Sequence, residues 1–193
     1  GNIREVDAIV HVLRCFEDGD VTHVEGKVDP IADAETVETE LMLADLESLE
    51  KRVPAFQKKA AQGDKDAKIA ASVLGQALEL LREGKPARLT VPKDDEERRT
   101  LDLAQLLTSK PVLYVCNVDD ASAANGNALS ARVFEKAKAE GAEAVVVSAA
   151  IEAEIVTMPP EDRGEFLADL VLSETGLTRV IRAGYALLHL ITF

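Results

Sequence analysis

Two apolar repeats on either side of a glycine turn constrain the fold of this 193-residue chain more than any other feature. The first repeat has alternating spacings of four and three residues, at Met42, Leu46, Leu49, Val53, Phe56 and Ala60. After Gln62-Gly63-Asp64 the same spacing resumes at Ala70, Leu74, Ala77 and Leu81. Such a heptad seam is typical of helices that pack along one another. Because the turn is short, we expect the two helices to be antiparallel.

The length of the first helix favours a projecting hairpin. A helix over residues 34–61 would be about 40 Å long at 1.5 Å per residue, which exceeds what a small sheet can cover. Gly84-Lys85-Pro86 is a stop signal for the second helix. Two helices lying flat on a sheet are the alternative.

Three short apolar runs outside the hairpin predict strands. They cover residues 8–13, 111–116 and 144–148, and the last two are almost continuously apolar, as expected for parallel strands covered on both faces. Helical patterns over 94–107, 127–140, 163–172 and 174–190 separate or follow them. This alternation predicts an α/β fold with an open parallel sheet. We expect residues 1–32 and 108–193 to form one domain and residues 33–107 to be an inserted antiparallel helical, coiled-coil arm.

The charge of the chain argues against a surface that coats nucleic acid. There are 22 Lys and Arg residues against 35 Asp and Glu residues, a formal net charge of −13. Residues 51–68 are an exception with a local net charge of +4, carried by Lys51, Arg52, Lys58, Lys59, Lys65 and Lys68. A basic tip on an acidic body is expected of an arm that touches RNA. A solvated hairpin end is the alternative.

Composition excludes several other classes of protein. No apolar run reaches the ~20 residues that span a bilayer, and the N-terminus lacks the pattern of a signal peptide. Cys15 and Cys116 are too few for a disulfide framework and fit a reducing cytosol. There is no metal-ligand spacing, so no metal site is expected within these residues. Both ends look cut, so we expect a piece of a longer protein.

Two short polar segments follow predicted strands and carry the chemistry. Asn117-Val118-Asp119-Asp120 ends the second strand, and Ser148-Ala149-Ala150 ends the third. Ligands of open α/β sheets gather beyond the carboxyl ends of the strands. An Asn amide can brace neighbouring loops there, a carboxylate can accept hydrogens from a base, and small side chains let a ligand approach backbone N–H groups. The segments match the base-recognition pair of translation-factor-type GTPases, N-K-x-D and S-A-K.

Longer strings resemble the YchF family of Obg-related P-loop NTPases. The resemblance covers essentially the whole chain, in order, and rests on residues 2–16, His23-Val24-Glu25-Gly26, Asp29-Pro30 and residues 39–47, 110–118 and 148–154. It implies a cytoplasmic, ribosome-associated ATPase that prefers ATP to GTP, uses Mg²⁺ and does not bind membranes. Together with the basic tip of the hairpin, ribosome association leads us to expect contact of the arm with the ribosome, including ribosomal RNA. Base-binding residues implied in this chain are Asn117, Val118, Asp120, Ser148, Ala149 and Ala150.

Three departures from the family pattern matter. No G-x-x-x-x-G-K-[ST] motif occurs, so the catalytic, phosphate-binding and Mg²⁺-binding residues are expected upstream of Gly1. The chain stops where the family enters its C-terminal TGS domain. Asp120 stands where the family usually has Glu, and Asp is the residue with which guanine-specific GTPases accept two base hydrogens. The alternative function is therefore an RNA- or ribosome-binding arm module with a regulatory, GTP-specific site.

Overall fold

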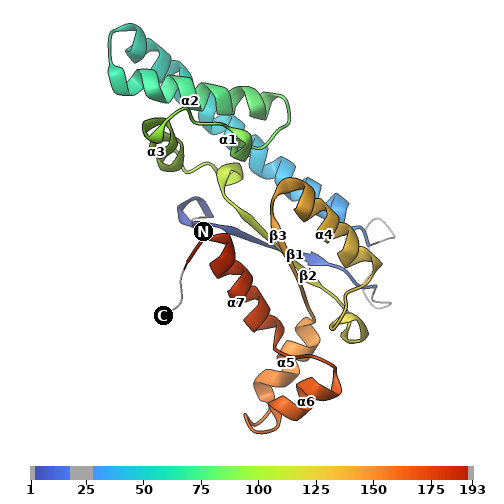
Figure 1. Cartoon of the computed structure of the whole chain (residues 1–193). Helices are drawn as coiled ribbons and strands as arrows, with labels where there is room; N and C mark the ends of the chain where they lie inside the picture. The colour runs from blue at the N-terminus through green and yellow to red at the C-terminus, as the bar shows by residue number, and fades with distance from the viewer. Residues whose placement is uncertain (1–2, 18–27, 191–193) are drawn as a thin grey trace. The chain divides into compact units, whose positions relative to one another are not determined.

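The computed structural model describes residues 3–17 and 28–190, and the chain divides into two compact units (Figure 1). The helical unit comprises Glu35–Pro111 and the residues up to Asp7, and the α/β unit comprises Ala8–Ala34 and Val112–Phe193. The segment before Asp7, which the sequence assigns to the α/β domain, groups with the helical unit. There Arg4 donates to Asp45 at 3.1 Å and Lys110 donates to the Val6 carbonyl at 2.5 Å. His23-Val24-Glu25-Gly26 lie outside the described residues.

The α/β unit contains a three-stranded parallel sheet, as predicted. Its strands are β1 (Ile9–Arg14), β2 (Val112–Asn117) and β3 (Glu143–Val147), in the order β1-β2-β3. In register, Val115 of β2 lies between Val12 of β1 and Val145 of β3. Because the strands are parallel, Asn117 and Val147 end at the same edge of the sheet.

Helices pack on both faces of this sheet. On one face, α4 (Ala128–Glu140) covers Tyr114 and Cys116, and on the other α7 (Gly176–Leu187) covers Leu113 and Val115 (Figure 1). The nearly complete burial of β2 explains its continuous apolar sequence. Two further helices, α5 (Ala149–Thr157) and α6 (Arg163–Asp169), contribute to a separate small apolar cluster.

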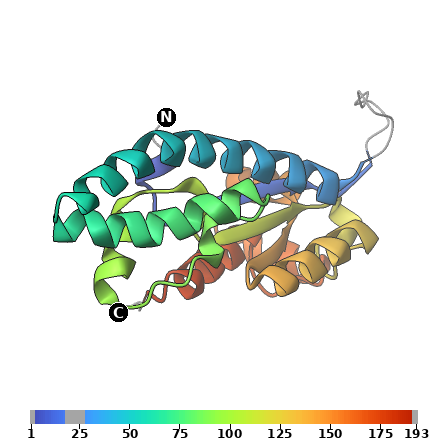
Figure 2. The ribbon, with the colours of Figure 1, turned by 90° about the horizontal axis from the view of Figure 1, so that it is seen from above.

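The helical unit is built on the predicted antiparallel pair, namely α1 (Pro30–Ala61) from Glu35 onward and α2 (Lys65–Arg82) (Figure 2). The carboxylate of Asp64 caps α2 by accepting the Ala67 N–H at 2.9 Å. The seam is confirmed, because all its members but Ala60 belong to the apolar core of this unit or pack against it. This core also includes residues that follow α2, at Ala87, Leu101, Ala104 and Leu106.

The helix predicted over residues 94–107 is too long. In the structure α3 spans Asp95–Leu103, Gln105 has a φ of 51°, and a 3₁₀ helix, η3, spans Leu107–Ser109. The fully buried carboxylate of Asp45 in α1 accepts the N–H groups of Leu107 and Thr108 at 2.9 and 2.8 Å. These bonds hold the start of η3 in place and are formed instead of the backbone bonds that would continue α3.

Other predicted bounds differ at the ends of elements. Among the helices, α6 stops at Asp169 and α7 runs only over Gly176–Leu187. The first described residues form a single 3₁₀ turn, η1 (Ile3–Glu5). Two more 3₁₀ helices, η2 (Ala87–Leu89) and η4 (Asp120–Ser122), lie in connections.

Candidate functional site

Asn117 joins the two segments that the sequence singles out. It is the last residue of β2, and its Oδ1 atom accepts the N–H of Ala149, the first residue of α5, at 2.9 Å. The predicted bracing of neighbouring loops by the Asn117 amide is thereby confirmed. In the described part of the chain the Nδ2 group of Asn117 has no protein acceptor, so it remains a donor at the carboxyl edge of the sheet.

Ser148 and Asp120 form a second link between the same segments. The Ser148 hydroxyl donates to Oδ1 of Asp120 at 2.6 Å and accepts the Ile151 N–H at 3.3 Å as the N-cap of α5. Ser148 is buried whereas Asp120 is exposed. One carboxylate oxygen of Asp120 is thus engaged within the protein, and the other can accept a hydrogen from a ligand.

Val118 does not present its side chain to this site. The side chain is 2% exposed and packs in the core beneath α4, and its N–H donates to the Val147 carbonyl at 2.9 Å. One carboxylate oxygen of Asp119 accepts the Ser122 N–H at 2.9 Å, within its own turn. Asn117 and Asp120 are the members of this tetrapeptide that bond to the second segment and still keep polar side-chain atoms for a ligand.

The start of α5 supplies backbone donors. Ala149 and Ala150 are exposed, and within the described residues the Ala150 N–H has no protein acceptor. First-turn N–H groups of a helix have no partner inside the helix, and methyl side chains leave them accessible. A ligand at this edge can therefore meet an amide donor, a carboxylate acceptor and a backbone donor together.

Two residues that the sequence analysis did not identify hold this site in place. Asn127, the N-cap of α4, donates from Nδ2 to the Cys15 carbonyl at 2.7 Å, and the Cys15 N–H donates to the Asn117 carbonyl at 2.7 Å. Glu152 of α5 accepts the N–H groups of Gly176 and Leu177 at 2.6 and 3.2 Å, which ties α5 to the start of α7. Asn127 has a local signal as a cap residue, whereas the contact of Glu152 depends on tertiary structure alone.

Comparisons with known proteins show the family of the chain. The chain is 48% identical over 192 residues to the ribosome-binding ATPase YchF of Haemophilus ducreyi and 45% identical over 194 residues to that of Bacillus subtilis. The matches cover 100% of this chain but 52% and 53% of the relatives. The chain belongs to the YchF family. No family profile matches it.

The fold agrees with this membership. The structure of the YchF GTPase of Schizosaccharomyces pombe matches with a TM-score of 0.81 at 26% identity, over 96% of this chain and 51% of that one. The chain therefore spans about half the length of the curated YchF relatives and of this structure.

Cys116 of this YchF chain is a poor nucleophile. Cys15 and Cys116 are both buried. A hydrogen bond between the two thiols and burial raise the pKa of Cys116 far above its ordinary value. Cys116 therefore stays protonated, as an unreactive thiol does.

The six basic residues of the hairpin differ in their availability. Lys51 donates to Glu47 at 2.6 Å, and this bond lowers the pKa of Glu47. Arg52 donates to the Ala104 carbonyl at 3.0 Å and is half-buried. The other four are exposed and make no ion pair within the described residues: Lys58, Lys59, Lys65 and Lys68. Arg52 therefore has a structural role, and the free positive charge belongs to the four lysines.

The described residues of this YchF segment do not fit a Mg²⁺ ion. Across residues 3–17 and 28–190, no group of three or more His, Cys, Asp or Glu side chains could hold a metal ion. Within the same residues, no helix has the length and apolar character needed to cross a membrane.

Proposed function

We propose that this chain is part of a ribosome-associated ATPase that hydrolyses ATP to ADP and phosphate and prefers ATP to GTP. The observation that carries the proposal is the pair of side-chain bonds, Asn117 to Ala149 and Asp120 to Ser148, that joins two polar segments into one site. The relatives from Haemophilus ducreyi and Bacillus subtilis bear the name ribosome-binding ATPase.

In this proposal the chain recognises the base and other residues carry out hydrolysis. Asn117 donates to a ring nitrogen, Asp120 accepts from the base edge, and the start of α5 from Ser148 to Ala150 closes the pocket. Val118 contributes by packing beneath the site. The phosphates and Mg²⁺ would be held by residues outside 1–193, because the chain has no P-loop sequence. We therefore expect residues 1–193 alone to hydrolyse nothing, and we place the full-length protein in the cytoplasm.

The preference for ATP is supported by the engagement of Asp120. A carboxylate recognises guanine by accepting two N–H groups, which works best when both of its oxygens are free. Here Oδ1 already accepts the Ser148 hydroxyl at 2.6 Å. Adenine lacks this pair of donors, so the affinity for adenine falls less than the affinity for guanine when one oxygen of Asp120 is occupied.

The second candidate is a ribosome- or RNA-binding arm module whose nucleotide site is regulatory and specific for GTP. Two observations favour it, namely the Asp at position 120 and the four exposed lysines of the hairpin. In both candidates we interpret residues 33–107 as an arm inserted in the nucleotide domain. Lys58, Lys59, Lys65 and Lys68 would supply its contacts to ribosomal RNA, because exposed lysines bind phosphates as point charges.

Competition binding to the full-length protein separates the candidates. A labelled ATP analogue is displaced by unlabelled ATP or GTP, and co-sedimentation with ribosomes is measured on the same preparation. The proposal predicts tighter binding of ATP. Guanine nucleotides that bound tenfold tighter or more would overturn it in favour of the regulatory GTP site.

A further inference from the structure

The outer edge of β3 is open for pairing. Across the described residues β3 pairs only with β2, and it lies at the end of the sheet order β1-β2-β3. A strand edge of this kind presents unpaired N–H and C=O groups that can pair with another chain.

The ladder shows which residues of β3 point outward. The Val147 carbonyl accepts the Val118 N–H, so Val147 directs its backbone groups toward β2. In a parallel strand both groups of a residue point to the same side, and the side alternates along the strand. Ala144 and Val146 therefore direct their N–H and C=O groups to the open edge.

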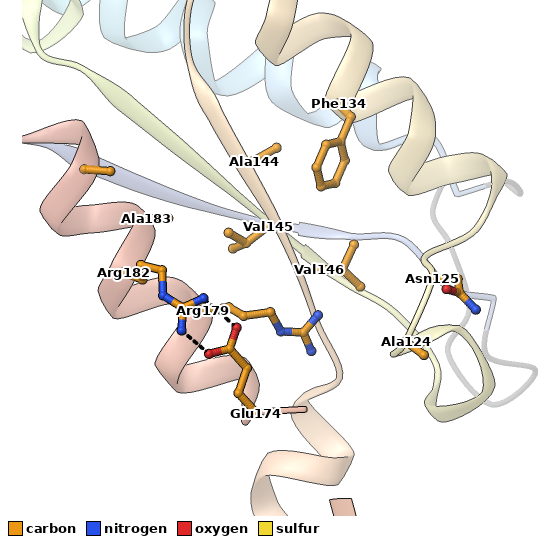
Figure 3. Close-up of a pocket in the computed structure, with 11 residues that line it drawn as sticks. Ala124, Asn125, Phe134, Ala144, Val145, Val146, Glu174, Arg179, Arg182 and Ala183 are labelled. Carbon is orange, nitrogen blue, oxygen red and sulfur yellow. Dashed lines mark hydrogen bonds and ion pairs between the residues drawn. The ribbon is translucent and has the colours of Figure 1, made fainter. Parts of the chain in front are cut away.

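A groove of about 500 Å³ runs along this edge (Figure 3). Three consecutive residues of β3 line it, namely Ala144, Val145 and Val146, so it follows the strand edge itself. One wall is Phe134 of α4, which is 43% exposed, and the opposite wall is α7 with Ala183. An extended segment in this groove would bury small apolar side chains against both walls.

One end of the groove carries a cation that needs an acceptor. Arg182 is neutralised by Glu174, with one of their two bonds at 2.9 Å. Arg179 has only a 3.4 Å contact from Nη1 to the Ala123 carbonyl, and its buried Nε has no hydrogen-bond partner in the described part of the protein. The half-buried guanidinium of Arg179 therefore keeps Nη donors that suit a carboxylate.

We propose that the β3 edge is a docking site for an extended segment of a partner protein, which adds to the sheet as a fourth strand. The segment pairs with the backbone of Ala144 and Val146, places small apolar side chains against Phe134 and Ala183, and brings one Asp or Glu to Arg179. Strand addition draws affinity from main-chain bonds and specificity from the pockets for alternate side chains.

The test uses a phage-displayed library of random dodecapeptides selected on the full-length protein. We expect enriched peptides to alternate apolar and polar residues and to carry one carboxylate. Ala144→Pro removes one outward N–H without touching the β2–β3 ladder. This substitution should lower the affinity of the protein for the enriched synthetic peptides at least about fivefold.

Two substitutions on the helices complete the design. Arg179→Gln should lower the affinity for the same peptides about tenfold. Arg132→Gln makes the same charge change on an exposed part of α4 and should leave that affinity unchanged. The thermal midpoint of each variant reports whether it folds, and Arg179→Gln leaves the backbone intact if the proline variant does not. Failure to enrich any peptide would overturn the proposal. Loss of binding in Arg179→Gln with unchanged binding in Ala144→Pro would replace strand addition by a simple anion site.

Discussion

The Oδ1 atom of Asn117 accepts the N–H of Ala149 at 2.9 Å, so the last residue of β2 holds the first residue of α5. The same amide keeps its Nδ2 donor for a ligand. Asn117 therefore both builds the candidate base site and offers a contact within it. A substitution of Asn117 should weaken the binding of ATP and GTP alike, whereas a substitution of Asp120 or Ser148 should change the preference between adenine and guanine.

Ser148→Ala is predicted to shift the full-length protein toward GTP. Without the Ser148 hydroxyl, both oxygens of Asp120 can accept the two N–H groups of guanine, so the affinity for GTP relative to ATP should rise about fivefold. The substitution also removes the N-cap of α5, at a cost of about 1 kcal/mol in the free energy of unfolding. Competition binding measures the ratio. An unchanged ratio in a folded variant would contradict the role given to Asp120.

Charge reversal at Lys58, Lys59 and Lys65 is predicted to abolish co-sedimentation with ribosomes. The three side chains are exposed and make no ion pair within the described residues, so a change to Glu removes attraction to phosphates without disturbing the hairpin. Hydrolysis of ATP should be unchanged. The exposed residues Arg98 and Arg99, changed to Glu, serve as a control in the same unit. A parallel loss of hydrolysis would mean that the arm and the nucleotide site are coupled.

Asp45→Asn is predicted to destabilise the helical unit by about 3 kcal/mol. The carboxylate is 0% exposed and accepts bonds from Leu107, Thr108 and Arg4. An amide presents a donor to these donors, which leaves some of them buried without a partner. Chemical denaturation measures the change. The exposed Glu40, changed to Gln, should stay within about 0.5 kcal/mol of the wild type, and equal stabilities of the two variants would contradict this account.

Much of this architecture could be predicted from local patterns. The spacing of Leu49 and Leu74 within the two apolar repeats predicts the helical pair, and the positions of Asn117 and Ser148 after strands predict their meeting at one edge. The burial of Val118 could not be foreseen from its place in the motif. The bonds of Asp45 to η3 span more than sixty residues, and the open edge beside Arg179 depends on how α4 and α7 flank β3. Such features arise from tertiary packing, which no local pattern encodes.

The stability of the helical unit should fall in acid through Glu97. The Lys93 N–H and the Ser72 hydroxyl donate to its carboxylate at 2.8 and 2.7 Å, and these bonds lower the pKa of Glu97 from its ordinary value of 4.5. A carboxyl with a lowered folded-state pKa contributes stability above its unfolded pKa and loses it as the pH falls through the folded one.

Glu97→Gln should therefore be less stable than the wild type at pH 7, with the difference shrinking as the pH falls below about 4.5. Denaturation across the pH range measures this difference. The neighbouring Glu96 is exposed, so Glu96→Gln should show no such trend. A difference between Glu97→Gln and the wild type that stayed constant with pH would show that the ionised carboxylate is not the stabilising form.

The most direct test of the base site is the affinity of the full-length protein for ATP and GTP before and after Asn117→Ala. We predict that the wild-type protein binds ATP more tightly than GTP. The affinity of the variant for each nucleotide should be at least about tenfold lower, because the substitution removes both the Nδ2 donor and the bond to Ala149. Asn125→Ala, the same change on an exposed loop outside the site, should leave both affinities unchanged. Equal affinities of wild type and Asn117→Ala would contradict the assignment of the β2 and β3 ends as the site that recognises the base.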